Sequence, residues 1–232
     1  MKIKLFLDTA DINQMRSFYH SGKAQGFTTN PSLMRQAGVE NYLAYAKEVA
    51  SLFPDFPLSL EVFADDMDGM YQQALKLAAL GKNIYVKIPI TNTQKISTYS
   101  VIEALAQKNI PLNITAIFTV AQVEHVVSAL RKEVPAIISI FSGRIANAGV
   151  DPVPICAEAV TIAKHLPLAE TLWASSREAF NVIQAEEAGC HIITMTPDLL
   201  KATENFGKDL TEYSLETVKM FFNDATKAGY VL

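Results

Sequence analysis

Short apolar runs alternate with longer amphipathic segments along this chain, and the pattern recurs eight times. In the amphipathic segment 64–81, for example, Met70, Ala74, Leu77 and Ala78 share one helical face. The apolar runs predict strands over residues 3–8, 25–29, 58–63, 83–88, 112–117, 136–142, 170–175 and 191–195. Strands that alternate with helices in this way predict a parallel sheet covered by helices.

The regularity of these units favours a closed sheet. No linker rich in Pro, Gly or Ser interrupts them, and no glycine-rich dinucleotide or phosphate loop follows any strand. The sequence therefore predicts an α/β protein with a single (β/α)8 TIM barrel over residues 1–232; an open doubly wound sheet is the alternative. Residues 208–232 are expected to form a C-terminal helical extension, amphipathic through Leu215, Val218, Phe221 and Phe222. It would cover either the barrel's own flank or a neighbouring subunit.

Composition argues against several classes of protein. The 232 residues carry a formal net charge of −4 and no basic run, which disfavours a nucleic-acid partner. No run approaches the roughly 20 apolar residues of a membrane span, and the first apolar stretch meets Asp8 too early for a signal peptide. Cys156 and Cys190 lie far apart in the sequence and are expected to be reduced core residues. We therefore expect a cytoplasmic protein with no membrane partner.

Lys87 is the residue that a purely structural account explains least. It lies inside the apolar run IYVKIPIT, and a lysine is seldom buried without a partner. Desolvation lowers the pKa of an amine, and a neutral amine attacks carbonyl groups to form a Schiff base. The protonated imine then withdraws electrons from a nearby carbon–carbon bond. A buried ion pair with Glu61 is the structural alternative.

Further polar residues stand at the carboxyl ends of the predicted strands, where barrels of this kind carry their active sites. Asn113 and Thr115 lie two residues apart and share a face, as do Ser139 and Phe141. Helix capping is the structural alternative for Asp8, and an ordinary turn is the alternative for Asn30. The candidates are Asp8, Thr29, Asn30, Ser32, Glu61, Lys87, Asn113, Thr115, Ser139, Arg144, Ser175 and Arg177.

Taken together, these residues predict one chemistry. Lys87 supplies the nucleophile, and Glu61 or Asp8 supplies a proton shuttle. Groups for sugar hydroxyls and a fork for a phosphate dianion complete the set: Asn30, Asn113 and Ser139 for the hydroxyls, and Arg144, Ser175 and Arg177 for the phosphate. The residues alone thus predict a Schiff-base lyase or transferase that acts on a phosphorylated polyol ketone.

Six motifs, in order along residues 6–178, resemble those of the transaldolase family: FLDTAD, GFTTNPSL, IYVKIPIT, NITAIF, FSGRI and WASSRE. The chain length and short loops are similar to the branch that contains small transaldolases and fructose-6-phosphate aldolases. The resemblance implies that Lys87 is the Schiff-base lysine and Asp8 the acid–base group at the scissile bond. It implies that Glu61 and Thr115 hold a water for proton transfer. It also implies the sugar-binding and phosphate-binding roles given above.

Two positions help to distinguish a transaldolase from a fructose-6-phosphate aldolase within this branch. Fructose-6-phosphate aldolases typically have glutamine where this chain has Glu61, and a tyrosine acid–base group where it has Phe141, which we place in the substrate site. A phenyl ring cannot donate a proton, so the enamine is expected to survive until an aldehyde acceptor binds. Ser142 and Ser176 depart from the family's usual residues near the phosphate.

The sequence therefore predicts a transaldolase of the pentose phosphate pathway. It would transfer a dihydroxyacetone unit from sedoheptulose 7-phosphate or fructose 6-phosphate to an aldose phosphate. The alternative is a class I aldolase that releases free dihydroxyacetone, and a barrel that only binds would leave Lys87 unexplained. The resemblance further implies no metal or organic cofactor and a homo-oligomer built from rings, a pentamer or a decamer.

Overall fold

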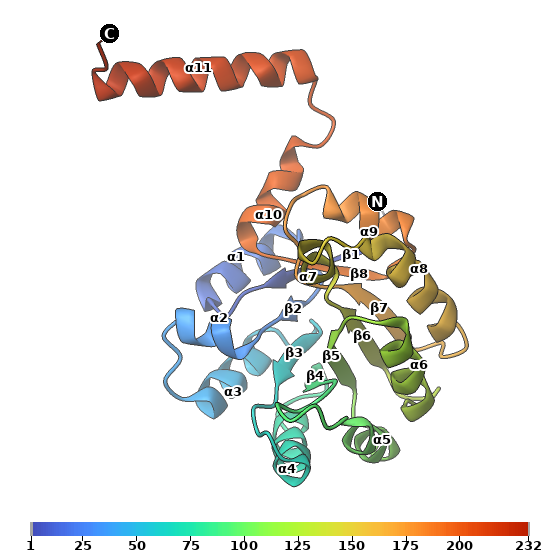
Figure 1. Ribbon diagram of the computed structural model, residues 1–232. Helices are drawn as coiled ribbons and strands as arrows, with labels where there is room; N and C mark the ends of the chain where they lie inside the picture. The colour runs from blue at the N-terminus through green and yellow to red at the C-terminus, as the bar shows by residue number, and fades with distance from the viewer. Residues whose placement is uncertain (1, 232) are drawn as a thin grey trace.

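Eight parallel strands close into a barrel in which each strand pairs with the next along the chain and β8 pairs with β1 (Figure 1). This computed structural model describes residues 2–231. The strands are β1 (Lys4–Asp8), β2 (Phe27–Thr28), β3 (Leu58–Glu61), β4 (Ile84–Pro89), β5 (Leu112–Ile117), β6 (Ala136–Ile140), β7 (Ala169–Trp173) and β8 (Ile192–Met195). The predicted (β/α)8 TIM barrel is confirmed.

Helices connect consecutive strands and surround the barrel. Helix α4 buries Met70, Ala74 and Leu77, most of the face that the sequence predicts. The helices are α1 (Ile12–Ser21), α2 (Pro31–Gln36), α3 (Tyr42–Leu52), α4 (Met67–Ala78), α5 (Tyr99–Gln107), α6 (Val120–Ala129), α7 (Ser142–Asn147), α8 (Pro152–Ala163), α9 (Asn181–Glu187), α10 (Pro197–Ala202) and α11 (Leu210–Ala228), with a 3-10 turn at Thr203–Asn205.

One segment differs from its predicted secondary structure. The amphipathic pattern of residues 176–189 predicts a helix that begins at residue 176, but α9 begins only at Asn181. The side-chain oxygen of Asn181 accepts hydrogen bonds from the backbone N–H groups of Arg177 (2.8 Å) and Glu178 (3.2 Å). These bonds hold the preceding residues in a turn, so that Arg177 lies on a loop at the end of the barrel.

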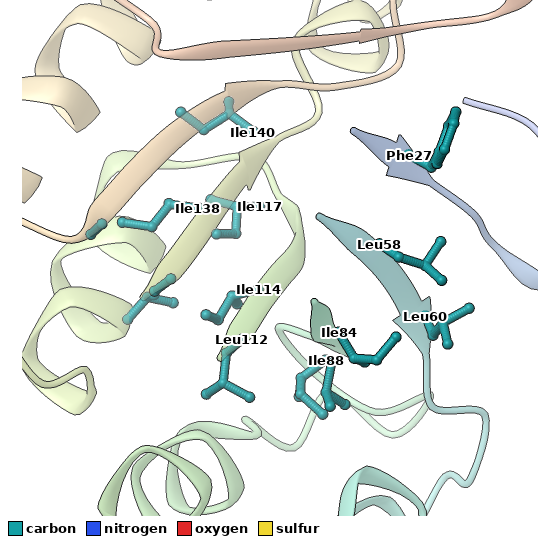
Figure 2. Packing of buried hydrophobic residues seen from close by; sticks show 14 of the residues in the cluster. Phe27, Leu58, Leu60, Ile84, Ile88, Leu112, Ile114, Ile117, Ile138 and Ile140 are labelled. Atoms are coloured by element: carbon teal, nitrogen blue, oxygen red, sulfur yellow. The ribbon is translucent and has the colours of Figure 1, made fainter. Parts of the chain in front are cut away.

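Alternate residues of each strand pack on opposite sides of the barrel wall. One set forms the large core between the strands and the helices, including Leu58, Leu112 and Ile138 (Figure 2). The other set faces the barrel interior and includes a smaller apolar cluster of Phe6, Ile137, Leu172, Ala174 and Ile192. Gly26 lies against this cluster, because a Cβ atom there would come 2.5 Å from the Phe6 ring. The interior is therefore filled with side chains rather than open.

The C-terminal helix stands apart from the barrel (Figure 1). Asp209 caps its N-terminus and Gly229 its C-terminus, and every residue of α11 is exposed. In this structure the helix does not cover the barrel's own flank, one of the two expectations for segment 208–232. Among residues 2–231, no helix is both long and apolar enough to span a membrane.

Candidate active site

A cavity of about 440 Å³ opens at the carboxyl ends of the strands. Ten of the eleven residues that the sequence assigns to catalysis or substrate binding line it: Asp8, Asn30, Glu61, Lys87, Thr115, Ser139, Phe141, Arg144, Ser175 and Arg177. They come from every strand or strand end except β8. The strand alternation and the barrel closure together bring these positions, which span 170 residues of sequence, to one place.

Lys87 lies on β4 with its side chain in the barrel interior and 8% exposed. Its Nζ atom lies 3.1 Å from Glu61 Oε2 and donates to the backbone oxygen of Thr29 at 3.0 Å. Glu61 is the register partner of Lys87 on β3, so the pairing of the two strands sets this contact. The structure contains the ion pair, and it places that pair on the wall of the cavity.

Asp8 is the last residue of β1 and also lines the cavity. Its Oδ1 atom accepts a hydrogen bond from the Thr28 hydroxyl at 2.7 Å. Burial raises the pKa of Asp8, while the positive charge of Lys87 and the Thr28 hydrogen bond oppose that rise in pKa. Asp8 does not cap the first helix; Asp11 does, accepting from the backbone N–H groups of Asn13 and Gln14. The capping alternative for Asp8 is therefore wrong.

Asn113 is the one residue assigned to substrate binding that does not line the cavity. It is fully buried on β5, where its Nδ2 donates to Ser59 Oγ at 2.9 Å and its Oδ1 accepts from Ser139 Oγ at 2.6 Å. Both ends of the amide are thus held by hydroxyls. Asn113 orients Ser139, which itself faces the cavity.

Thr115 lies beside an irregularity in β5. Ala116 has a φ of 59°, and the pairing of β5 with β6 shifts register between Ile114 and Ile117. This bulge is typical of strands next to functional sites. The hydroxyl of Thr115 is buried and has no hydrogen-bond partner among the residues that the structure describes, and the residue lines the cavity. An unpaired buried hydroxyl at a cavity wall is a candidate partner for a molecule bound there.

Two arginines supply positive charge at one end of the cavity. Arg144 lies on α7, with its Cζ atom 5.9 Å from the centroid of the Phe141 ring, and Arg177 follows β7. Between them Ser175 has a φ of 64°, a left-handed conformation that non-glycine residues adopt rarely. A Cβ atom on Gly143 would come 1.7 Å from the backbone oxygen of Ser175, so only glycine fits there. Such an arrangement suits a phosphate dianion.

Asn30 has a structural role and also lines the cavity, as a substrate-binding residue would. Its side-chain oxygen caps α2 by accepting from the backbone N–H of Leu33 at 3.0 Å, and the residue also lines the cavity. The cap uses one lone pair of the oxygen, so the amide N–H groups and the second lone pair remain for a ligand.

Sequence reasoning chose the wrong threonine of the pair at the end of β2. The hydroxyl of Thr29 donates to the backbone oxygen of Ser59 at 2.8 Å, and Thr28 faces the cavity instead. Thr194 on β8 also lines the cavity and was not identified, and Ser176, noted only as a departure from the family's usual residue, lines it as well. Strand alternation would have identified Thr28, because it lies two residues before Asn30 and therefore shares its face. Thr194 could have been chosen in the same way, since it is the polar residue of the β8 run that faces the interior.

The arrangement thus places an amine beside a carboxylate, with a second carboxylate, several hydroxyls and two guanidinium groups around one cavity. The amine can form an imine with a carbonyl substrate, and the neighbouring carboxylate can transfer the protons that imine formation and hydrolysis require. The two guanidinium groups can bind an anionic group of the same substrate.

Comparisons with known proteins identify one enzyme family. The model of the family described as "Transaldolase/Fructose-6-phosphate aldolase" matches residues 5–231. A probable transaldolase of Thermoanaerobacter sp. (strain X514) is 33% identical over 98% of this chain and 99% of its own length. Another from Caldicellulosiruptor saccharolyticus is 35% identical over 92% and 94%.

Among solved structures, KGPDC from Streptococcus mutans matches with a TM-score of 0.57 over 87% of this chain and 91% of its own chain. Only 10% of the residues are identical, so this likeness supports the fold alone. The family match over almost the whole chain carries the identification. This chain is an enzyme of the transaldolase/fructose-6-phosphate aldolase family.

Proposed function

We propose that this enzyme is a transaldolase that moves a dihydroxyacetone unit between phosphorylated sugars through a Schiff base on Lys87. The observation that carries the proposal is the position of Lys87 Nζ, buried on the cavity wall and 3.1 Å from Glu61. Asp8 and the two arginines line the same cavity, so one ketose phosphate can contact all of these groups.

The cycle begins when Lys87 transfers its proton, for which Glu61 is the nearest base, and attacks the ketone carbon. The carbinolamine loses water with the help of Glu61 and a water held by Thr115, and a protonated imine forms. Asp8 then takes the proton of the hydroxyl on the fourth carbon as the bond between the third and fourth carbons breaks. The bond electrons move to the imine, the aldose leaves, and an enamine remains on Lys87. An incoming aldehyde reverses the steps.

Phe141 favours transfer over release. It lines the cavity next to Arg144, and its ring offers no O–H that could protonate the enamine. An enamine that is protonated slowly persists until an aldose phosphate binds. Arg144, Ser175 and Arg177 are proposed to bind the phosphate of both donor and acceptor, while Asn30 and Ser139 bind the dihydroxyacetone portion.

Borohydride reduction tests the reaction class and the residue together. With fructose 6-phosphate present, we expect a reduced three-carbon unit on the peptide that contains Lys87, measured by mass spectrometry. A Lys82→Ala variant should be labelled like the wild type, because Lys82 is exposed and lies before β4. Labelling that persists at the same level in a Lys87→Ala variant would exclude this mechanism.

The choice between transferase and aldolase needs a second measurement. We expect little free dihydroxyacetone from fructose 6-phosphate alone, and fast product formation once erythrose 4-phosphate is added. A Phe141→Tyr variant should release dihydroxyacetone faster without an acceptor. Rapid release by the wild type would instead identify the enzyme as an aldolase.

We also propose a second copy of the chain as the partner of α11. Helices in proteins gain most of their stability from packing of an apolar face, yet Val218, Phe221 and Phe222 are 59–70% exposed on one face of α11. Met34, Val39, Tyr42 and Phe63 line an apolar groove on the barrel. Insertion of α11 into that groove of the next copy gives a head-to-tail contact, and such contacts form a ring when the rotation between copies closes.

Light scattering on the full chain tests this association. We expect a ring-sized oligomer for the wild type and for an Asn223→Asp control, and a smaller species for Phe221→Asp. Asn223 lies on the same helix but at least 100° around its axis from Val218, Phe221 and Phe222. A monomeric wild type at micromolar concentration would overturn the proposal.

A further inference from the structure

Two threonine hydroxyls lie next to Asp8 and have no role in the cycle described above. Thr28 is 2% exposed and Thr194 is 5% exposed. They come from β2 and β8, the strands that flank β1 on either side. Thr28 Oγ1 lies 2.7 Å from Asp8 Oδ1 and 2.5 Å from Thr194 Oγ1. The three side chains therefore form a continuous hydrogen-bonded row across the barrel interior.

The direction of the row follows from the number of protons. An ionised carboxylate only accepts hydrogen bonds, and a hydroxyl has a single proton to donate. Thr28 therefore donates its proton to Asp8, so in its second contact its oxygen must accept. Thr194 is the donor there. Both hydroxyls point their protons toward the carboxylate, and each hydrogen bond polarises the next.

We propose that Thr28 and Thr194 are positioning residues that hold Asp8 in one orientation, with Oδ1 engaged by Thr28 and Oδ2 left to exchange protons with the substrate. The inference rests on the proposed function, because it assigns Asp8 the proton transfer at the scissile bond. In the cleavage step the substrate hydroxyl proton goes to Oδ2, and in the reverse step it returns from Oδ2 to the aldehyde oxygen of the acceptor. The Thr28 proton stays on Thr28 throughout.

The surroundings of Asp8 explain why such a device is useful. Burial raises the pKa of Asp8, and the Thr28 hydrogen bond is one of two contacts that act against it. The other is the positive charge of Lys87, which is lost when the protonated imine becomes the neutral enamine. The threonine row is independent of the substrate, so it keeps stabilising the ionised carboxylate at every stage of the cycle.

The Thr28→Val variant tests the proposal with little change in side-chain shape. Loss of a hydrogen bond to a charged group is expected to lower kcat about tenfold or more. The acid limb of the pH profile should move to higher pH, since burial then acts on Asp8 without that opposing contact. A Thr28→Ser variant restores the hydroxyl and should recover both the rate and the pH profile.

Thr194→Val tests the second member of the row. Thr28 keeps its bond to Asp8 in this variant, so the shift of the acid limb should have the same direction and a smaller size. Thr171→Val is the matched control: Thr171 is fully buried in the same sheet, contacts His191 Nδ1 at 3.0 Å and lies outside the cavity. It is expected to lower Tm about as much as Thr28→Val while leaving the pH profile unchanged.

Trapping with dihydroxyacetone separates this inference from the proposed function. Imine formation from dihydroxyacetone breaks no carbon–carbon bond, so Thr28→Val should be labelled at Lys87 like the wild type while turning over fructose 6-phosphate slowly. Wild-type enzyme that cannot be trapped would refute the proposed function. Normal trapping with an unshifted acid limb in Thr28→Val, or an equal shift in Thr28→Ser, would refute the positioning role alone.

Discussion

The barrel interior has two layers that share strands but differ in character. Earlier along the strands, Phe6, Tyr85, Ile137, Leu172 and Ile192 face inward and are mostly apolar, and of these five Leu172 also lines the cavity. Two residues further along the same strands, Asp8, Lys87, Ser139, Ala174 and Thr194 face the cavity. Strand alternation makes both sets interior. Only the choice of side chain makes one layer a core and the other a reactive site.

The difference shows how the fold separates stability from chemistry. Burial of the lower layer stabilises the barrel through apolar area removed from water. The upper layer does the reverse, because partly buried carboxylates and a buried ammonium must be desolvated, and this cost is offset by their contacts with one another and by hydrogen bonds with Thr28 and Thr29. The catalytic groups are therefore supported by a rigid apolar layer directly beneath them. Substitutions in the lower layer are expected to lower stability and largely preserve activity, whereas substitutions in the upper layer are expected to lower activity most.

The largest effect is expected from the upper layer at Lys87. Lys87→Met removes the nucleophile and should lower activity by on the order of 10⁴-fold or more, measured as transfer to erythrose 4-phosphate. It also leaves Glu61 without its cation, so Tm should fall. A Lys87→Met/Glu61→Gln double variant should recover Tm without activity. Tyr85→Phe, two residues earlier on β4, should remain active; its loss of activity would break the distinction between the layers.

An intermediate effect is expected from the pair on β6. Ile137→Ala opens a cavity in the lower layer and should cost about 3 kcal/mol of unfolding free energy, or roughly 6–12 °C in Tm. Ser139→Ala, in the upper layer, should change Tm little and lower activity about tenfold by removing the hydroxyl that Asn113 holds. Thermal denaturation and steady-state kinetics on both variants provide the comparison. Equal losses of activity would contradict it.

The smallest effect concerns the pH dependence of stability at Asp8. A carboxyl group whose pKa is raised by folding stabilises the fold at acid pH, and that contribution is lost as pH rises through the folded-state pKa. Asp8→Asn should therefore raise Tm at neutral pH, and the gain should shrink as pH falls.

Asp65→Asn provides a control of opposite sign. Hydrogen bonds from Thr93 lower the pKa of Asp65, so its charged form stabilises the fold at neutral pH and the substitution should lower Tm there. A pH-independent change in Tm for Asp8→Asn would show that its ionisation does not govern stability.

Much of the site could be predicted because strand periodicity is a local property. The spacing of Asn113 from Thr115 and of Ser139 from Phe141 fixes a shared face without any knowledge of the partners. Closure of eight such strands then places all strand ends together. The helical start of segment 176–189 was predicted wrongly, because the Asn181 side chain turns the backbone there through hydrogen bonds that propensity does not describe.

The residues that sequence reasoning missed have neighbours that are remote in the chain. Thr28 acquires its role from Asp8 and from Thr194, which lies 166 residues away. Asn113 was predicted to bind the substrate, but the hydroxyls of Ser59 and Ser139 hydrogen-bond its amide and it does not line the cavity. Neither contact leaves a trace in the local pattern.

By itself, the sequence determined the barrel, the inward-facing positions and the presence of a lysine among apolar residues, since these depend on side-chain type and on a period of two. The tertiary structure decided which carboxylate lies beside Lys87, which threonine contacts Asp8 and that α11 is free of the barrel. Strand register and loop conformation set distances of about 3 Å across the barrel interior, and they arise from the packing of the whole chain rather than from any one segment.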